Sequence, residues 1–169
     1  MISDEYRRLN RKLHDTNPLY GSSGGKRVAD VMQLVRDLNA YDILDYGCGK
    51  GTLKQFMPVP VKEYDPAIIG KDTRPSQAQL VVCTDVLEHV EPEWLDTVIG
   101  DIAHLSKVAA YIIVHTGEAK KFLEDGRNAH LTQEPGSWWM EKLKPHFYEI
   151  EMEETQTEAI FRCQKSPLC

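Results

Sequence analysis

The chain has 169 residues, of which 41% are hydrophobic and 27% charged, and its formal net charge is −6. This length and composition fit one soluble domain with one hydrophobic core. The acidic balance argues against nucleic acid as a partner, because neutralising phosphates requires clustered Lys and Arg. No apolar run approaches the roughly 20 residues of a membrane span. The polar start of the chain also differs from a signal peptide, so we expect a cytoplasmic protein that contacts no membrane.

The spacing of cysteine and histidine gives no sign of a disulfide framework or of a metal site. No two of the four cysteines form a C-x-x-C pair: they are Cys48, Cys83, Cys163 and Cys169. The six histidines are scattered, without an H-E-x-x-H pair. We therefore expect reduced, structural thiols and no bound metal.

The first 41 residues predict two helices joined by a glycine- and serine-rich loop. Tyr6, Leu9 and Leu13 are spaced for a helix over residues 3–14, and apolar residues predict a second over 26–38. The basic side chains of the first helix are either a nucleic-acid contact or a solvated face: Arg7, Arg8, Arg11 and Lys12. We expect residues 1–41 to form an N-terminal helical segment and a candidate lid.

From residue 42 onward, apolar strands alternate with helices. Strands are predicted at 42–46, 61–64, 79–84 and 109–115, helices at 52–57, 93–106 and 137–144, and an antiparallel hairpin at 147–152 and 159–164. This alternation predicts a doubly wound, mostly parallel, Rossmann-like α/β sheet within a single domain, with residues 42–169 as its core. Ligands of such sheets bind at the carboxyl ends of the strands.

A glycine loop follows the first predicted strand. Asp45, Gly47, Gly49 and Gly51 alternate with other residues and lead into a helix. Glycines permit the turn and a close backbone approach, and the helix start offers N–H groups to an anion such as a carboxylate. The acid at position 45 suits an ammonium group and would repel a pyrophosphate. The alternative is a tight turn without a ligand.

Two further strand ends carry acids. Asp65 follows the strand at 61–64, where a carboxylate can accept both hydroxyls of a ribose. Glu63 is the second candidate acid there, and a turn-capping role for Asp65 is the structural alternative. Asp85 follows the strand at 79–84 in the same way.

These segments resemble the motifs of the class I S-adenosylmethionine-dependent methyltransferases, in particular small, compact bacterial and phage members. Residues 43–51 resemble the first motif, 61–66 the second, and 80–90 the strand end that lines the cofactor near its methyl group. The resemblance implies S-adenosylmethionine as the cofactor. It also implies the cofactor-binding residues, with Tyr20 as a lid contact: Asp45, Tyr46, Gly47, Cys48, Gly49, Gly51, Tyr64, Asp65, Asp72, Thr84, Asp85, Val86 and Tyr20.

The interval from Asp65 to Leu80 is shorter than is usual in this family, so the fold is expected to be shortened between its second and fourth strands. There is room for little of the usual helix and strand. Asp72 is then a remnant of the third motif, where an acid often meets the adenine amino group, or an ordinary loop acid.

The acceptor side is predicted from the segment between the strand at 109–115 and the last helix. Residues 126–131 resemble a segment of predicted bacterial and phage methyltransferases. A histidine is the natural base for an acceptor hydroxyl or amine, and we expect His130 first and His115 second as catalytic residues. Candidate substrate contacts are Arg127, His89 and Trp138. In the structural alternatives, the histidines are part of the packing, Arg127 pairs with Asp125, and His89 belongs to a helix start.

The resemblance implies a methyltransferase that acts on a small-molecule or sugar-like acceptor, as a monomer or homodimer. No Asn/Asp-Pro-Pro-Tyr/Phe tetrad follows the strand at 79–84, which argues against amino methylation of DNA bases. Two alternatives stay open. One is a cofactor-binding regulatory protein without turnover, and the other is an enzyme that cleaves S-adenosylmethionine.

Overall fold

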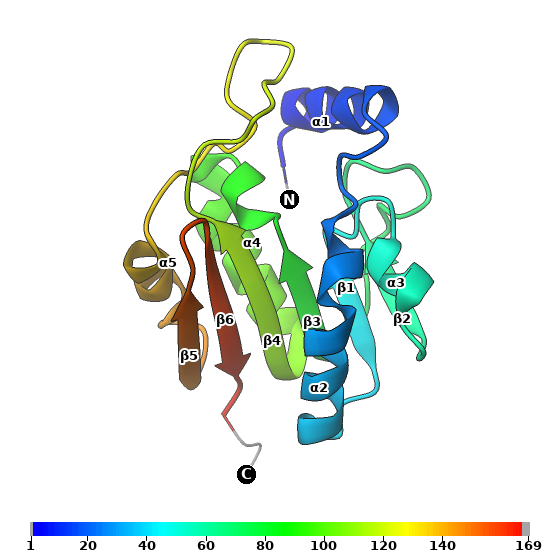
Figure 1. Cartoon of the computed structure of the whole chain (residues 1–169), viewed down its shortest axis with the longest axis vertical. Helices are drawn as coiled ribbons and strands as arrows, with labels where there is room; N and C mark the ends of the chain where they lie inside the picture. The colour runs from blue at the N-terminus through cyan, green and yellow to red at the C-terminus, as the bar shows by residue number, and fades with distance from the viewer. Residues whose placement is uncertain (1, 167–169) are drawn as a thin grey trace.

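The computed structural model describes residues 2–166 and contains a six-stranded sheet in the order β2-β1-β3-β4-β6-β5 (Figure 1). The first four strands of this order are parallel, and β6 pairs antiparallel with both β4 and β5. The strands are β1 (Ile43–Tyr46), β2 (Val61–Tyr64), β3 (Ala78–Thr84), β4 (Ser106–His115), β5 (Glu149–Glu154) and β6 (Glu158–Gln164). The predicted α/β class and the closing antiparallel hairpin are confirmed.

Helices cover both faces of the sheet. The α-helices are α1 (Asp4–Thr16), α2 (Val28–Leu38), α3 (Thr52–Phe56), α4 (Pro92–Leu105) and α5 (Gly136–Leu143), with short 3-10 turns η1 (Ser23–Arg27) and η2 (Leu87–His89). Successive strand side chains point to opposite faces, so Leu80 packs with α2 and α3 whereas Val81 packs with α4 and α5. This double covering explains why β1, β3 and β4 are almost continuously apolar.

Most elements lie within three residues of their predicted bounds, and two differences have a clear cause. The helix expected from residue 26 begins at Val28, because residues 23–27 form the tighter turn η1. The strand expected at 147–152 lies at 149–154, and all of its glutamates are exposed. An exposed edge strand has no buried face to mark its register, so its alternation is weak.

The segment between β2 and β3 is short, as predicted. Residues 65–77 contain no helix or strand. Strand β2 is therefore an edge of the sheet, and β5 is the other edge. Strand β5 carries Glu149, Glu151, Glu153 and Glu154, all exposed.

Helix α1 lies across the carboxyl ends of the parallel strands (Figure 1). Ser3 accepts from the Tyr6 backbone N–H as the helix N-cap, and it also donates through its backbone N–H and its hydroxyl to the Glu91 carboxylate at 2.8 and 2.6 Å. At the other side of the sheet, Arg11 donates to the Ala67 carbonyl at 3.1 Å. These contacts hold α1 over the edge where ligands bind.

The basic face of α1 has partners on the protein itself. Arg8 and Lys12 both pair with Glu124, in the loop after β4. Helix α2 was predicted to belong with α1 to an N-terminal helical segment. It packs against the sheet through Val31 and Val35. Whether residues 1–41 act as a lid stays a prediction.

Cys48, Cys83 and Cys163 are buried free thiols, and Cys169 lies outside the described residues. Among residues 2–166, no helix has the length and apolarity to cross a membrane.

Candidate functional site

The glycine loop after β1 turns tightly, and other segments of the chain pack closely against it. Gly47 has φ of 76°, and a Cβ there would overlap the side chain of Val86. Gly49 has φ of 51°, and a Cβ there would overlap the backbone of Gly21. The Lys50 N–H also donates to the Gly21 carbonyl at 2.7 Å. Close packing therefore requires glycine at both positions, against Val86 at Gly47 and against Gly21 at Gly49, in addition to any contact with a ligand.

Asp65 lies at the carboxyl end of β2 beside this loop. Its carboxylate accepts from the Gly49 N–H at 3.0 Å and from the Ala67 N–H at 2.9 Å, one bond to each oxygen. The side chain is buried, yet it lines the cavity described below. Each oxygen keeps a second lone pair, so the carboxylate can still accept ligand hydroxyls.

Asp45 is buried behind the loop and does not line the cavity. Burial is the main cause that raises the pKa of its carboxyl to about 7; the nearby Glu63 contributes to the rise and Lys71 opposes it. One carboxyl oxygen, Oδ2, is buried without a hydrogen-bond partner. Glu63 itself pairs with Lys54 and Lys71 and does not line the cavity. Asp65, directly after β2, is therefore the acid at this strand end that faces the cavity.

Three histidines converge at the carboxyl ends of β3 and β4. His89 ends the turn η2, His115 ends β4, and His130 comes from the loop that follows β4. The ring of His130 lies 4.8 Å from that of His89 and 4.8 Å from that of His115, between ring centroids. Tyr20 extends this row, with its ring 5.8 Å from His89.

Main-chain carbonyls fix the tautomers of two of these imidazoles. His89 Nδ1 lies 2.7 Å from the Ala129 oxygen, and His130 Nδ1 lies 2.6 Å from the Gly117 oxygen. A carbonyl can only accept, so each Nδ1 carries the proton and each Nε2 keeps its lone pair. Burial lowers the pKa of His130 and lowers that of His89 to about 3, so both rings are neutral near pH 7.

Glu88 precedes His89 and is fully buried. Its Oε1 accepts from the His115 backbone N–H at 3.0 Å, whereas its Oε2 has no partner. Burial, followed by the charge of Asp85, raises the pKa of this carboxyl well above its usual range. Asp85 itself has φ of 56°, an uncommon conformation for a residue other than glycine, which marks a constrained turn at this strand end.

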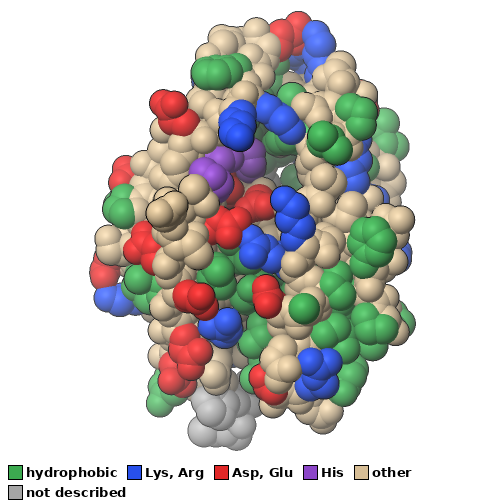
Figure 2. Space-filling model, viewed as in Figure 1, with side chains coloured by type: hydrophobic (Ala, Val, Ile, Leu, Met, Phe, Trp, Pro, Cys, Tyr) green, Lys and Arg blue, Asp and Glu red, His purple; other side chains and the backbone are tan. Residues whose placement is uncertain are grey.

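These groups share one cavity of about 530 Å³ beneath α1. Figure 2 shows histidine side chains at a hollow in this face of the molecule, with both basic and acidic side chains around it. Ten of the residues predicted for the site line the cavity: Tyr20, Tyr46, Gly47, Gly49, Asp65, Asp85, Val86, His89, His115 and His130. The volume falls within the usual range for small-molecule sites.

The remaining predicted residues do not line this cavity, and several have other partners. Arg127 is exposed and pairs with Asp125 at 2.7 Å. Trp138 packs against Trp139 and Lys142 at α5. Asp72 is exposed and accepts from the Gly70 N–H. The others lie behind the loop and strand ends: Asp45, Cys48, Gly51, Tyr64 and Thr84. Their predicted roles stay predictions.

The sequence matches no family model. It also matches no curated protein. The structure, by contrast, resembles solved methyltransferases. Magnesium protoporphyrin IX methyltransferase (ChlM) from Synechocystis PCC 6803 with bound SAM aligns with a TM-score of 0.66 and 16% identity, over 97% of this chain and 99% of that chain. The fold is that of the class I S-adenosylmethionine-dependent methyltransferases.

Two other structures with this methyltransferase fold align over most of both chains. Burkholderia thailandensis 1,6-didemethyltoxoflavin-N1-methyltransferase, solved with 1,6-didemethyltoxoflavin and S-adenosylhomocysteine, gives a TM-score of 0.61 and 14% identity, over 96% of this chain and 90% of that chain. The DhpI–SAH complex gives a TM-score of 0.62 and 16% identity, over 97% of this chain and 95% of that chain. At identities this low, the structural alignments establish the fold alone, and the activity has to be argued from the site.

Sequence reasoning missed several cavity residues of this methyltransferase fold. Glu88 is not among the predicted site residues, although its position four residues after the end of the buried strand β3 was a usable signal. His14 and Lys121 also line the cavity. Lys121 lies 5.1 Å from the centre of the Tyr20 ring, and His14 lies 4.6 Å from that ring. Both come from segments without a recognised motif.

Proposed function

We propose that this protein is an S-adenosylmethionine-dependent methyltransferase that acts on a small-molecule or sugar-like acceptor. The observation that supports it most is the convergence of three strand ends on one cavity: the glycine loop after β1, Asp65 after β2, and Asp85 with Val86 after β3. Ligands of doubly wound sheets bind at this carboxyl edge, at the point where the strand order reverses beside β1.

The residues of this edge fit the cofactor. Asp65 faces the cavity with lone pairs free for the ribose hydroxyls, and Gly47 and Gly49 bring the loop backbone to the same wall. Tyr20 also lines the cavity, as a candidate contact from the N-terminal segment. When bound, S-adenosylmethionine supplies an activated methyl group on its sulfonium, and the protein supplies alignment.

On the acceptor side, His130 is the candidate base. Its Nδ1 proton is committed to the Gly117 carbonyl, and burial keeps the ring neutral by lowering its pKa. The Nε2 lone pair is therefore available to take a proton from an acceptor hydroxyl or amine. His115, with its ring next to that of His130, is the second candidate.

Calorimetric titration with S-adenosylmethionine and S-adenosylhomocysteine tests cofactor binding. We expect both to bind, and Asp65→Ala to weaken binding by about tenfold or more, because hydrogen bonds to a charged group contribute about 1.5–3 kcal/mol each. Asp37→Ala, an exposed acid of α2 outside the cavity, is the matched control and should bind normally. No binding of either compound to the natural chain would refute the proposal.

Transfer of a labelled methyl group to acceptors in cell extracts tests turnover. We expect His130→Ala to abolish transfer while leaving the affinity for S-adenosylhomocysteine within about twofold, because the ring lies on the acceptor side of the cavity. Full transfer activity in this variant would remove His130 from the catalytic residues and leave His115 as the candidate.

A regulatory protein without turnover is the second candidate function. It is favoured by residues 65–77, which form no helix or strand beside the part of the cavity lined by Pro66 and Ala67. Cofactor binding without transfer to any acceptor would support this reading. Consumption of S-adenosylmethionine without an acceptor would instead support a cleaving enzyme.

A further inference from the structure

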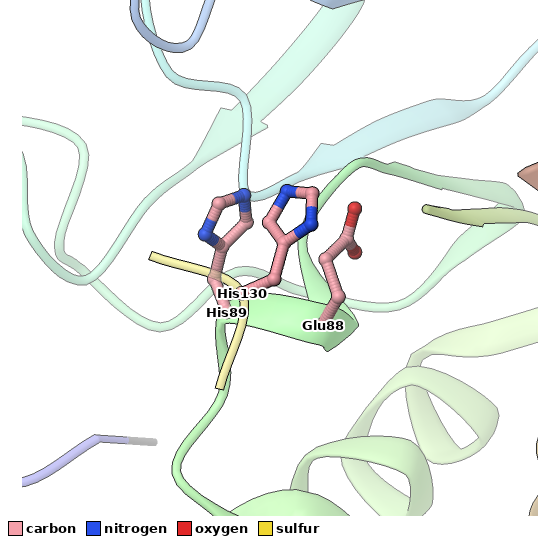
Figure 3. Close-up of side chains that lie close together, drawn as sticks. All are labelled: Glu88, His89 and His130. Atoms are coloured by element: carbon pink, nitrogen blue, oxygen red, sulfur yellow. The ribbon is translucent and has the colours of Figure 1, made fainter. Parts of the chain in front are cut away.

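The acceptor side of the cavity brings one carboxyl group and two imidazoles close together. Glu88, His89 and His130 each offer one ligand atom, and these atoms lie within 4.8 Å of one another. Figure 3 shows the three side chains next to one another, two from η2 and one from the loop after β4. All three line the cavity.

Each of the three side chains has one polar atom that is held by the main chain. Main-chain carbonyls hold the Nδ1–H groups of His89 and His130, and the His115 N–H holds Glu88 Oε1. The atoms left over are two imidazole lone pairs and one carboxylate oxygen. Histidines that bind metals are held in this way, with the second nitrogen donating to a carbonyl or carboxylate.

Glu88 provides the independent indication that a cation belongs here. Its side chain is fully buried, and Oε2 lies in the cavity wall without a hydrogen-bond partner. A buried polar atom without a partner costs about 1–3 kcal/mol, and more if it is charged. Neither imidazole makes a hydrogen bond to this oxygen. A cation bound by all three atoms would satisfy every one of them.

From this arrangement we infer that Glu88, His89 and His130 form a binding site for a first-row divalent transition metal. Two imidazoles and one carboxylate are a donor set of Zn²⁺ and Fe²⁺ sites that keep open positions for a substrate, and imidazole disfavours Mg²⁺ and Ca²⁺. Two ligands at about 2.1 Å from one ion lie at most about 4.2 Å apart. A pair at the upper limit of 4.8 Å therefore needs to close by about 0.6 Å on binding.

The site departs from the sequence-based prediction of no metal, because its ligands come from two segments with no motif spacing between them. It also changes the role of His130, whose Nε2 cannot hold a metal and take a proton at once. An acceptor hydroxyl on an open position of the metal would lose its proton more readily. This last consequence rests on the proposed function, whereas metal binding itself does not.

Metal binding is tested on the full chain after removal of metals with a chelator. Calorimetric titration with Zn²⁺, without cofactor, should give one bound equivalent. Titration with Co²⁺ should give visible absorption bands of nitrogen and oxygen coordination. Loss of one of three ligands exceeds the 10–100-fold cost of losing a second-shell partner, so Glu88→Gln, His89→Ala and His130→Ala should each weaken binding by about 100-fold or more.

Glu88→Gln is the most informative variant, because its amide oxygen can keep the bond from His115 while the charge is lost. The matched control is His104→Ala, an exposed histidine of α4 outside the cavity, which should bind Zn²⁺ like the natural chain. Equal Zn²⁺ affinity in the natural chain and in Glu88→Gln, or loss of binding in His104→Ala, would overturn the site. Titration with S-adenosylhomocysteine on the same samples reports separately on cofactor binding and on folding.

Discussion

Asp45, in β1 just before the glycine loop, lowers the stability of the folded chain when its carboxyl is ionised. Its carboxyl is buried near Glu63 and Asp65, with only Lys71 as a nearby opposing charge, and its pKa is raised to about 7 from 3.8. At low pH the group is protonated in both the folded and the unfolded chain. As the pH rises above 3.8 the unfolded chain ionises first, so the contribution of Asp45 to stability is lost progressively up to about pH 7.

The substitution Asp45→Asn removes this pH dependence. We expect the free energy of unfolding of the variant, minus that of the natural chain, to rise between about pH 4 and pH 7 by on the order of 4 kcal/mol, and to be constant above that. Denaturant unfolding at several pH values measures it. In Asp125→Asn the difference should change in the opposite sense, because Arg127 lowers the pKa of Asp125. A flat difference for Asp45→Asn would contradict the raised pKa.

At the scale of elements, α1 is held by contacts at its N-terminus and near its middle. Ser3 joins it to Glu91 at the start of α4, and Arg11 joins it to the turn after β2. Tyr6 and Leu9 pack against Leu123 of the loop after β4, in a cluster separate from the two clusters on the sheet. A small separate cluster and a few polar contacts define a unit that can open without unfolding the sheet.

Ser3→Ala removes the N-cap of α1 and the hydroxyl bond to Glu91, and it keeps the bond from the backbone N–H of residue 3. Loss of an N-cap costs about 1 kcal/mol, and loss of a hydrogen bond to a charged group costs about 1.5 kcal/mol or more. We therefore expect amide hydrogen exchange in α1 to rise by about tenfold or more while exchange in α4 and β3 stays unchanged. The control Thr16→Ala loses one exposed bond to the Lys12 carbonyl at the other end of α1 and leaves the bond to Glu91 intact. Equal exchange rates in the two variants would contradict a role for Ser3 in holding α1 down.

At the scale of the whole molecule, most of the sheet could be predicted because its buried strands leave local signals in the sequence. Apolar runs marked β3 and β4, and the glycines marked the end of β1. The two faces followed from the alternation of side chains that is visible in the core clusters. The fold class and the candidate cofactor wall were therefore accessible from the sequence.

The acceptor side was less accessible, because it depends on the course of the loop after β4. Residues 116–135 contain no regular helix or strand beyond an isolated bridge between Phe122 and Asn128. Its path is fixed by bonds such as that from the Leu131 N–H to the Glu88 carbonyl at 2.7 Å. No periodicity encodes such a contact, so the meeting of His130 with His89 could only be found in three dimensions.

The acidic edge strand β5 also bears on how copies of this protein meet. An edge strand presents unpaired backbone groups to any similar strand, and natural sheets often resist this with charges. Two β5 edges side by side would bring the exposed glutamates of one copy, Glu149, Glu151, Glu153 and Glu154, close to those of the other. Like charges on neighbouring strands repel one another. Extension of the sheet from one copy into the next through β5 is therefore opposed by the chemistry of that strand.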